Sequence, residues 1–198
     1  MLDAISLQEF EPLDIVFARM GGMAAGTLNR ALDTLIRKGL VQAETKRTGR
    51  SWTRFGLITP KGWEHLGKTS RYPSLRGGVT HTNVCYLKKR LDEKQSCEKS
   101  FCEHRLDGST GFHDVVSIKK GKYHVTEVVI GCDTNLAHHA RDCLINSKVP
   151  VETLTIVSLL KSEHPKLRDM ILSEPDLVFH IQRVSFLAVE DILKELYR

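Results

Sequence analysis

Two apolar runs separated by a short turn constrain the fold more than any other feature of this sequence. The runs are "HDVVSIK" at 113–119 and "YHVTEVVI" at 123–130, and the letters KKGK span the turn. Glycine in such a turn favours a tight connection between antiparallel strands. If Lys120 and Gly121 form a two-residue loop, the flanking lysines pair with each other. This pairing then sets the register of the whole hairpin.

In that register, Asp114 lies directly opposite Glu127. Two like charges whose Cβ atoms are about 5 Å apart destabilise a hairpin. A cation between the carboxylates removes the repulsion, and hard divalent ions such as Mg²⁺ prefer carboxylate oxygens. We therefore interpret Asp114 and Glu127 as a candidate metal site. The alternatives are a register shifted by one residue, or a pair that opens to solvent, where the repulsion is small.

The rest of the second half alternates between helical and strand patterns. We expect helices at 79–94, 135–147, 163–173 and 186–197, and strands at 98–106, 151–160 and 177–183. Together with the hairpin, the order is αβββαβαβα. This order predicts an α/β domain (α+β for the whole chain) with a mixed sheet flanked by helices. The apolar face of the last helix caps the sheet or forms a dimer interface.

The first half has a different pattern, in which helices precede a basic hairpin. Apolar residues recur at helical spacing over 6–20 and over 24–39. Two short strands, at 40–46 and 52–58, then flank the basic turn RTGRS. A short helix with Thr59 as its N-cap follows the second strand.

Helix, helix and basic hairpin is the order of a winged helix-turn-helix, although such modules usually begin with a further helix. In these modules one helix enters the major groove of DNA and the hairpin, or wing, contacts phosphates or the minor groove. Residues 1–90 contain 15 Lys and Arg against 7 Asp and Glu, which favours a polyanionic partner. The candidate DNA-binding residues are Thr27, Arg30, Thr34, Arg37, Lys46, Arg47, Arg50 and Arg54. The alternatives are a protein-docking module and a basic surface that is merely solvated.

The segment "GKTSRYPSLRGG" at 67–78 combines Gly, Ser, Pro and basic residues, which is typical of a linker. The sequence therefore predicts a DNA-binding domain at 1–66, a linker at 67–78 and an α/β domain at 79–198.

The cysteines and the hydropathy pattern indicate an intracellular setting. The chain contains five cysteines, and neither a membrane-spanning stretch nor a secretory leader is recognisable. We therefore expect a cytoplasmic protein with reduced thiols and no membrane partner. The Cys and His residues at 97–104 and at 132–143 lack the paired short spacing of structural zinc sites. Buried thiols and surface histidines are the favoured interpretation.

An αβββαβ core with an acid on each of two adjacent strands resembles the PD-(D/E)XK, restriction-endonuclease-like fold. In this resemblance Asp114 matches the first acid, and Glu127 matches the second. The motif's lysine falls at Val129, and valine can neither activate water nor stabilise charge on a phosphate. The resemblance implies Mg²⁺ or Mn²⁺ as the cofactor of any hydrolysis.

The two halves together are similar to the C-terminal region of conjugation and HerA/FtsK-type ATPases, and to replication-relaxation-like proteins of mobile elements. In those proteins a winged helix precedes a nuclease-like domain that opens with a Gly-Gly-x-acid-His helix. Gly77, Gly78 and His81 match this pattern, and Thr80 replaces the acid. His81 is therefore a further candidate site residue, as is Arg141 on the helix after the third strand.

These patterns predict a DNA-binding protein with a degenerate, inactive nuclease-like domain, acting as an adaptor or regulator in mobile-element DNA processing. One alternative is a Mg²⁺- or Mn²⁺-dependent endonuclease that uses Asp114 and Glu127. A further alternative is a protein-interaction module that docks on a DNA-motor ATPase or forms a homodimer. Double-stranded DNA is the partner that the first two hypotheses share.

Overall fold

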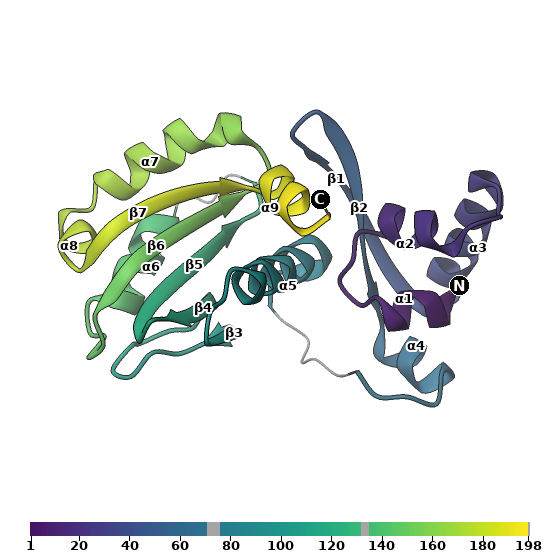
Figure 1. The fold of residues 1–198 in the computed structure, drawn as a ribbon, viewed down its shortest axis with the longest axis horizontal. Helices are drawn as coiled ribbons and strands as arrows, with labels where there is room; N and C mark the ends of the chain where they lie inside the picture. The colour runs from purple at the N-terminus through teal and green to yellow at the C-terminus, as the bar shows by residue number, and fades with distance from the viewer. Residues whose placement is uncertain (71–75, 132–134, 198) are drawn as a thin grey trace. The chain divides into compact units, whose positions relative to one another are not determined.

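The computed structural model describes residues 1–70, 76–131 and 135–197 (Figure 1). The chain divides into two compact units. The first unit comprises residues 1–47 and 51–83, and the second comprises residues 48–50 and 84–198. The boundary after Asn83 falls inside a continuous helix, later along the chain than the predicted linker. Part of that linker, residues 71–75, lies outside the described residues.

The first unit consists of helices followed by a two-stranded hairpin. Its elements are α1 (Leu2–Leu7), α2 (Leu13–Met20), α3 (Ala25–Arg37), β1 (Val41–Thr48), β2 (Ser51–Ile58) and α4 (Pro60–His65). A core that includes Leu13, Val16, Leu32 and Trp63 holds these elements together. Thr59 caps α4 as predicted, because its hydroxyl accepts a hydrogen bond of 3.0 Å from the Gly62 amide.

The prediction of one helix over 6–20 is wrong, because this stretch contains parts of two helices. The chain breaks at Phe10, which has a positive φ of 66°, and Pro12 is the N-cap residue of α2. Proline has no amide hydrogen to donate and disfavours helical backbone in the residue before it. Three helices therefore precede the hairpin, where the sequence predicted two.

The second unit contains a five-stranded mixed sheet with helices on its faces. Its elements are α5 (Gly78–Lys94), β3 (Lys99–His104), β4 (His113–Lys119), β5 (Lys122–Val129), α6 (Leu136–Leu144), β6 (Val151–Ser158), the 3₁₀ turn η1 (Lys161–Glu163), α7 (His164–Leu172), α8 (Pro175–Phe179), β7 (Ile181–Ala188) and α9 (Val189–Tyr197). The strand order is β3-β4-β5-β6-β7. The β3–β4 and β4–β5 pairs are antiparallel, whereas β5, β6 and β7 run parallel. The predicted mixed α/β sheet is confirmed.

The hairpin register predicted from the turn is confirmed. Lys119 lies opposite Lys122, and Val115 lies opposite Thr126. Lys120 and Gly121 have φ values of 52° and 71°, the left-handed conformation that a two-residue type I′ turn requires at both central positions.

The strand predicted at 177–183 is wrong, as is the start of the last helix at 186. Residues 175–179 form α8, which Pro175 opens, and the strand β7 runs to Ala188. Pro at the first helical position is preorganised for a helix, which explains α8. Residues 186–188 continue the helical spacing of the last helix, but they pair with β6 as part of β7. A 2.8 Å hydrogen bond between the Thr155 and Ser185 hydroxyls supports this pairing.

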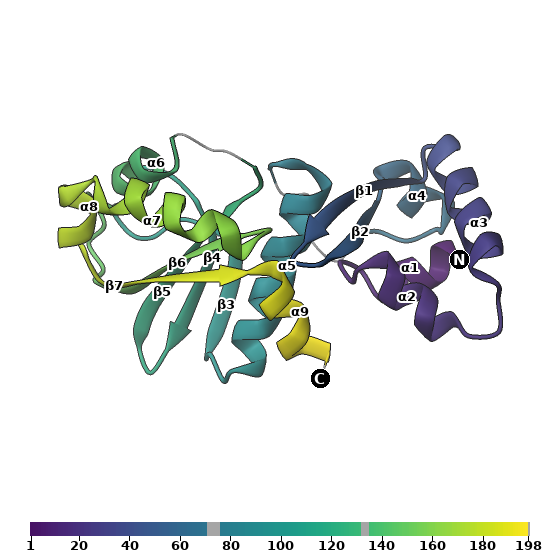
Figure 2. The same ribbon diagram turned by 90° about the horizontal axis from the view of Figure 1, so that it is seen from above.

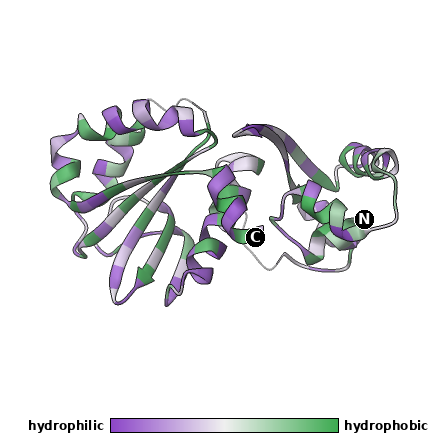
Figure 3. Ribbon diagram, turned by 45° about the horizontal axis from the view of Figure 1, so that its top comes forward, coloured by the Kyte–Doolittle hydropathy of each residue, from purple (hydrophilic) through white to green (hydrophobic). Residues whose placement is uncertain are grey.

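The two faces of the sheet pack on different helices (Figure 2). Val116 and Val125 belong to a core with Leu154, Ala140 of α6 and Ile171 of α7. On the other face, the Ser117 hydroxyl donates to Asp92 of α5 over 2.6 Å. Hydrophilic and hydrophobic residues alternate around the helices (Figure 3), as expected for helices with one face on a core.

Candidate functional site

Asp114 lies near the start of β4 and departs from the alternation of that strand. Regular alternation would place its side chain on the same face as Val116. Its carboxylate instead lies close to Cys85 on α5, the helix that covers the opposite face. One carboxylate oxygen, Oδ2, accepts a 2.7 Å hydrogen bond from the Val128 amide. This bond orients the carboxylate at the end of the hairpin.

Glu127 is buried in β5, where it follows the alternation of Val125 and Val129. Its Oε1 atom lies 2.6 Å from Nδ1 of His113, and both side chains are almost completely buried. Burial lowers the pKa of His113 to about 4, so the imidazole is neutral at pH 7, and its Nδ1 atom is hydrogen-bonded to Glu127. Each of the two acids thus has its own hydrogen-bond partner in the protein. A cation held jointly by Asp114 and Glu127 stays a prediction.

Val129, at the position of the motif's lysine, is a core residue. It is 3% exposed and packs in the same cluster as Leu136 and Ala140 of α6. This position faces an aliphatic core, in which an ammonium group would have no water.

The other residues of the resemblance occupy different surroundings. Thr80, at the place of the family's acid, is buried and donates a hydrogen bond of 2.5 Å to Glu44 of β1. The guanidinium of Arg141 pairs with Asp142 at 2.8 Å and with Glu174 at 3.4 Å. His81 lies close to Asp114. Arg141, in contrast, pairs with Asp142 and Glu174.

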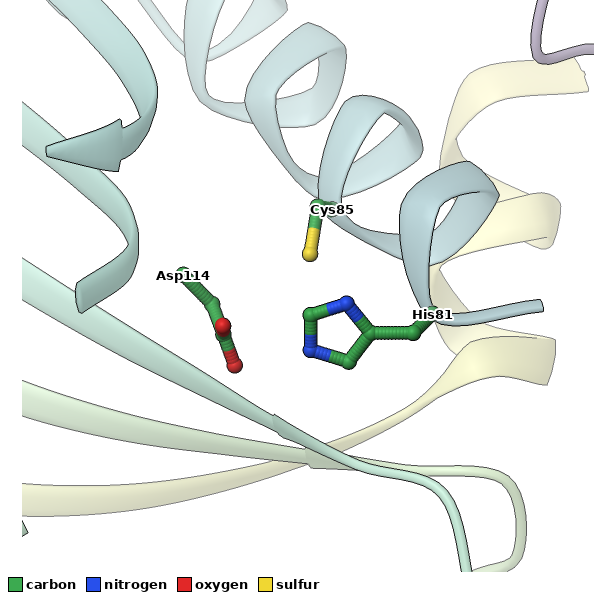
Figure 4. Close-up of side chains that lie close together, drawn as sticks. All are labelled: His81, Cys85 and Asp114. Carbon is green, nitrogen blue, oxygen red and sulfur yellow. The ribbon is translucent and has the colours of Figure 1, made fainter. Parts of the chain in front are cut away.

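His81, Cys85 and Asp114 place an imidazole, a thiol and a carboxylate together (Figure 4). One ligand-type atom from each residue lies within 4.8 Å of the other two. Over residues 1–70, 76–131 and 135–197 this is the one group of three or more His, Cys, Asp or Glu residues with such spacing. Burial, followed by the charge of Asp114, raises the pKa of the Cys85 thiol well above its usual value. The prediction singled out His81 and Asp114, but it missed Cys85.

The other cysteines fit the interpretation as thiols. No disulfide joins any of the four cysteines in the described part of the chain. Cys143 is buried, its Sγ atom is 3.8 Å from Nε2 of the exposed His139, and burial raises its pKa to about 11. Cys132 lies outside the described residues.

The DNA-binding residues predicted on α3 lie mainly on its exposed side. Thr27, Arg30 and Arg37 are exposed, whereas Thr34 is half-buried. Thr34 donates to the Arg30 carbonyl over 2.9 Å and accepts from Arg37 Nη2 at 3.3 Å. These contacts hold the side chains along one stripe of the helix.

The basic residues of the hairpin fall into two groups. Arg47 and Arg50 are exposed, and their guanidinium groups form no ion pair with any described residue. Lys46 lies 3.8 Å from Glu44, and Arg54 donates to Asn29 of α3 over 2.7 Å. Arg54 therefore positions β2 against α3, a role for which the sequence contains no local signal.

Trp52 is a further surface residue that sequence reasoning missed. It lies on β2, and it is 69% exposed, whereas the second tryptophan, Trp63, is buried. A large aromatic two residues after Arg50 was a signal that could have revealed it, since an exposed indole offers a stacking surface.

The comparisons with known proteins supply no family. No family model matches the chain, and no curated protein matches it. Two solved structures are similar in part. A protein of unknown function, AF1548, gives a TM-score of 0.41 at 13% identity over 59% of this chain. Protein VC1899 from Vibrio cholerae gives a TM-score of 0.42 at 11% identity over 90% of this chain.

The matched regions span 66% of the AF1548 chain and 42% of the VC1899 chain. Similarity at these TM-scores and identities says nothing about the function of this chain. Separately, no helix in the described ranges has the length and apolar character needed to cross a membrane.

Proposed function

We propose that this chain binds double-stranded DNA through α3 and the β1–β2 hairpin. The observation that carries the proposal is a set of exposed cations, Arg30, Arg47 and Arg50, that form no ion pair within the described residues. A cation that no carboxylate neutralises can displace counterions from phosphates at little cost. The order of three helices and a hairpin supports a winged-helix interpretation, in which α3 enters the major groove.

The second unit, in this proposal, is a degenerate nuclease-like domain without hydrolytic activity. Val129 supports this part, because the position that needs a lysine is packed in an aliphatic core. A chain that binds DNA without cutting it acts as an adaptor or regulator. The sequence resemblance suggests mobile-element DNA processing as the setting.

The double variant Arg30→Ala/Arg50→Ala tests DNA binding. We expect about ten- to hundredfold weaker binding to duplex DNA, and a salt dependence whose slope falls by about 2, because two phosphate or base contacts are lost. The matched control is Arg183→Ala/Lys148→Ala, which removes the same charge from exposed positions of the second unit. Equal affinity of the two double variants would contradict the proposed surface.

Trp52 offers an independent measurement of the same contact. Because Trp63 is buried, a change of tryptophan fluorescence on adding DNA is expected to come from Trp52. We expect DNA to alter the emission of the native chain, and Trp52→Phe to abolish most of that response. A response that survives in Trp52→Phe would place the DNA elsewhere.

A metal-dependent endonuclease is the second candidate, favoured by the presence of Asp114 in a group of metal-ligand types. Incubation of plasmid, linear and single-stranded DNA with Mg²⁺ or Mn²⁺ decides between the two. Cleavage by the native chain that is lost in Asp114→Ala would show that the second unit is an active nuclease. Binding that ignores salt would instead favour the protein-interaction module, with a DNA-motor ATPase or a second copy of the chain as partner.

A further inference from the structure

We propose that His81, Cys85 and Asp114 form a binding site for Zn²⁺ or a similar borderline-soft divalent cation. The site differs from the Mg²⁺ or Mn²⁺ site that the sequence predicts, because it shares only Asp114 with it. It also does not rest on DNA binding by the first unit, so either proposal can fail alone.

The backbone places the three ligands in a suitable arrangement. His81 and Cys85 are four residues apart on α5, a spacing that puts both side chains on one face of the helix. Asp114 reaches this face from β4 because it departs from the strand alternation. Figure 4 shows the three side chains close together, with the His81 imidazole facing the Asp114 carboxylate and the Cys85 thiol beside them.

The distances are close to those that zinc needs. The ligand-type atoms lie within 4.8 Å of one another. Zinc bonds of about 2.0–2.3 Å place tetrahedral ligand atoms about 3.3–3.8 Å apart. In this proposal, small rotations of the three side chains close the gap. Three protein ligands leave one position for water or a further ligand, as in zinc sites that are not purely structural.

The donor set selects the class of cation. A thiolate and an imidazole are ligands for zinc and its transition-metal neighbours, whereas Mg²⁺ takes oxygen ligands. Metal binding to a cysteine requires the thiolate, so the Cys85 thiol loses its proton when the cation binds, and binding releases about one proton per metal.

Neighbouring groups hold two of the ligands in place. The Val128 amide donates to Asp114 Oδ2, and this bond fixes the orientation of the carboxylate beside α5. Gly77 lies against the His81 ring, and a Cβ atom at Gly77 would be 2.7 Å from the ring's Cγ. Gly77 also has a φ of +93°, a conformation that other residues rarely adopt. Glycine at this position therefore leaves room for the imidazole.

Titration of the full chain with Co²⁺, a spectroscopic substitute for Zn²⁺, tests the site. We expect a thiolate-to-cobalt charge-transfer band, with one equivalent of Zn²⁺ displacing the Co²⁺. Cys85→Ser should abolish the band, and His81→Gln or Asp114→Asn should weaken binding by at least about tenfold to a hundredfold. Gly77→Ala should weaken binding as well.

The matched control is Cys143→Ser, which alters a buried thiol that also lies next to a histidine but, among the described residues, belongs to no group of three ligands. This variant should keep the band. To separate loss of binding from loss of folding, thermal unfolding is measured with and without Zn²⁺. Metal should raise the Tm of the native chain and not that of Cys85→Ser. Absence of the band in the native chain, or a band that survives Cys85→Ser, would overturn the proposal.

Discussion

Replacing Asp92 with Ala is expected to lower the free energy of unfolding by about 3–5 kcal/mol. Asp92 is buried in α5, and its Oδ1 atom lies 2.5 Å from Nζ of Lys88, one turn earlier on the same helix. Its other oxygen accepts from the Ser117 hydroxyl, which lies 2.8 Å from the Ser100 hydroxyl. Removing the carboxylate leaves a buried ammonium group with no counter-charge, and that charge causes most of the loss.

The same helix supplies a matched control. Lys89 and Glu93 form an ion pair with the same spacing, one residue further along, but the Glu93 side chain is 46% exposed. Glu93→Ala should therefore cost no more than about 0.5 kcal/mol. Urea unfolding of both variants measures the difference. A similar loss in both would mean that burial does not determine the contribution of Asp92.

The apolar double variant Lys88→Met/Asp92→Leu extends the test. Replacement of a buried ion pair by apolar residues of similar volume is often neutral or stabilising. We expect the double variant to recover most of the stability that Asp92→Ala loses. A double variant as unstable as the single one would show that the hydrogen bonds to the sheet, rather than the uncompensated charge, dominate.

Introducing the motif's lysine through Val129→Lys is expected to destabilise the second unit by about 3–5 kcal/mol, and not to create a nuclease. Val129 is 3% exposed in the aliphatic core, so the ammonium group would be buried without a partner. The cost should diminish above about pH 10, because the unfolded lysine then also loses its proton.

Val129→Met is the control for size, because its side chain is long but apolar. Overpacking by the methionine should cost about 1–3 kcal/mol, without the dependence on pH. Unfolding midpoints at neutral and alkaline pH measure both variants, and incubation with Mn²⁺ and plasmid measures cleavage. A stable Val129→Lys chain that cuts DNA would contradict both expectations.

The candidate site was only partly predictable from the sequence. Asp114 was recognised because a charge stands out in an apolar strand, and His81 through its resemblance to a family pattern. Cys85 has no such signal, because an isolated thiol between Val84 and Tyr86 is typical of a core residue. Cys85 is a candidate ligand only because the Asp114 side chain reaches α5. Regular strand alternation predicts that this side chain lies on the opposite face of the sheet.

The sequence by itself determined the features that depend on neighbouring residues. The KKGK turn set the register of β4 and β5, and Thr59 set the start of α4, because turns and caps are formed by residues a few positions apart. The tertiary structure alone decided the extent of β7, the direction of the Asp114 carboxylate and the role of Arg54. These depend on a parallel neighbour strand, a covering helix and a partner on α3. Contacts between residues far apart in the chain outweigh local preference, because each buries or hydrogen-bonds a group that local structure would leave unsatisfied.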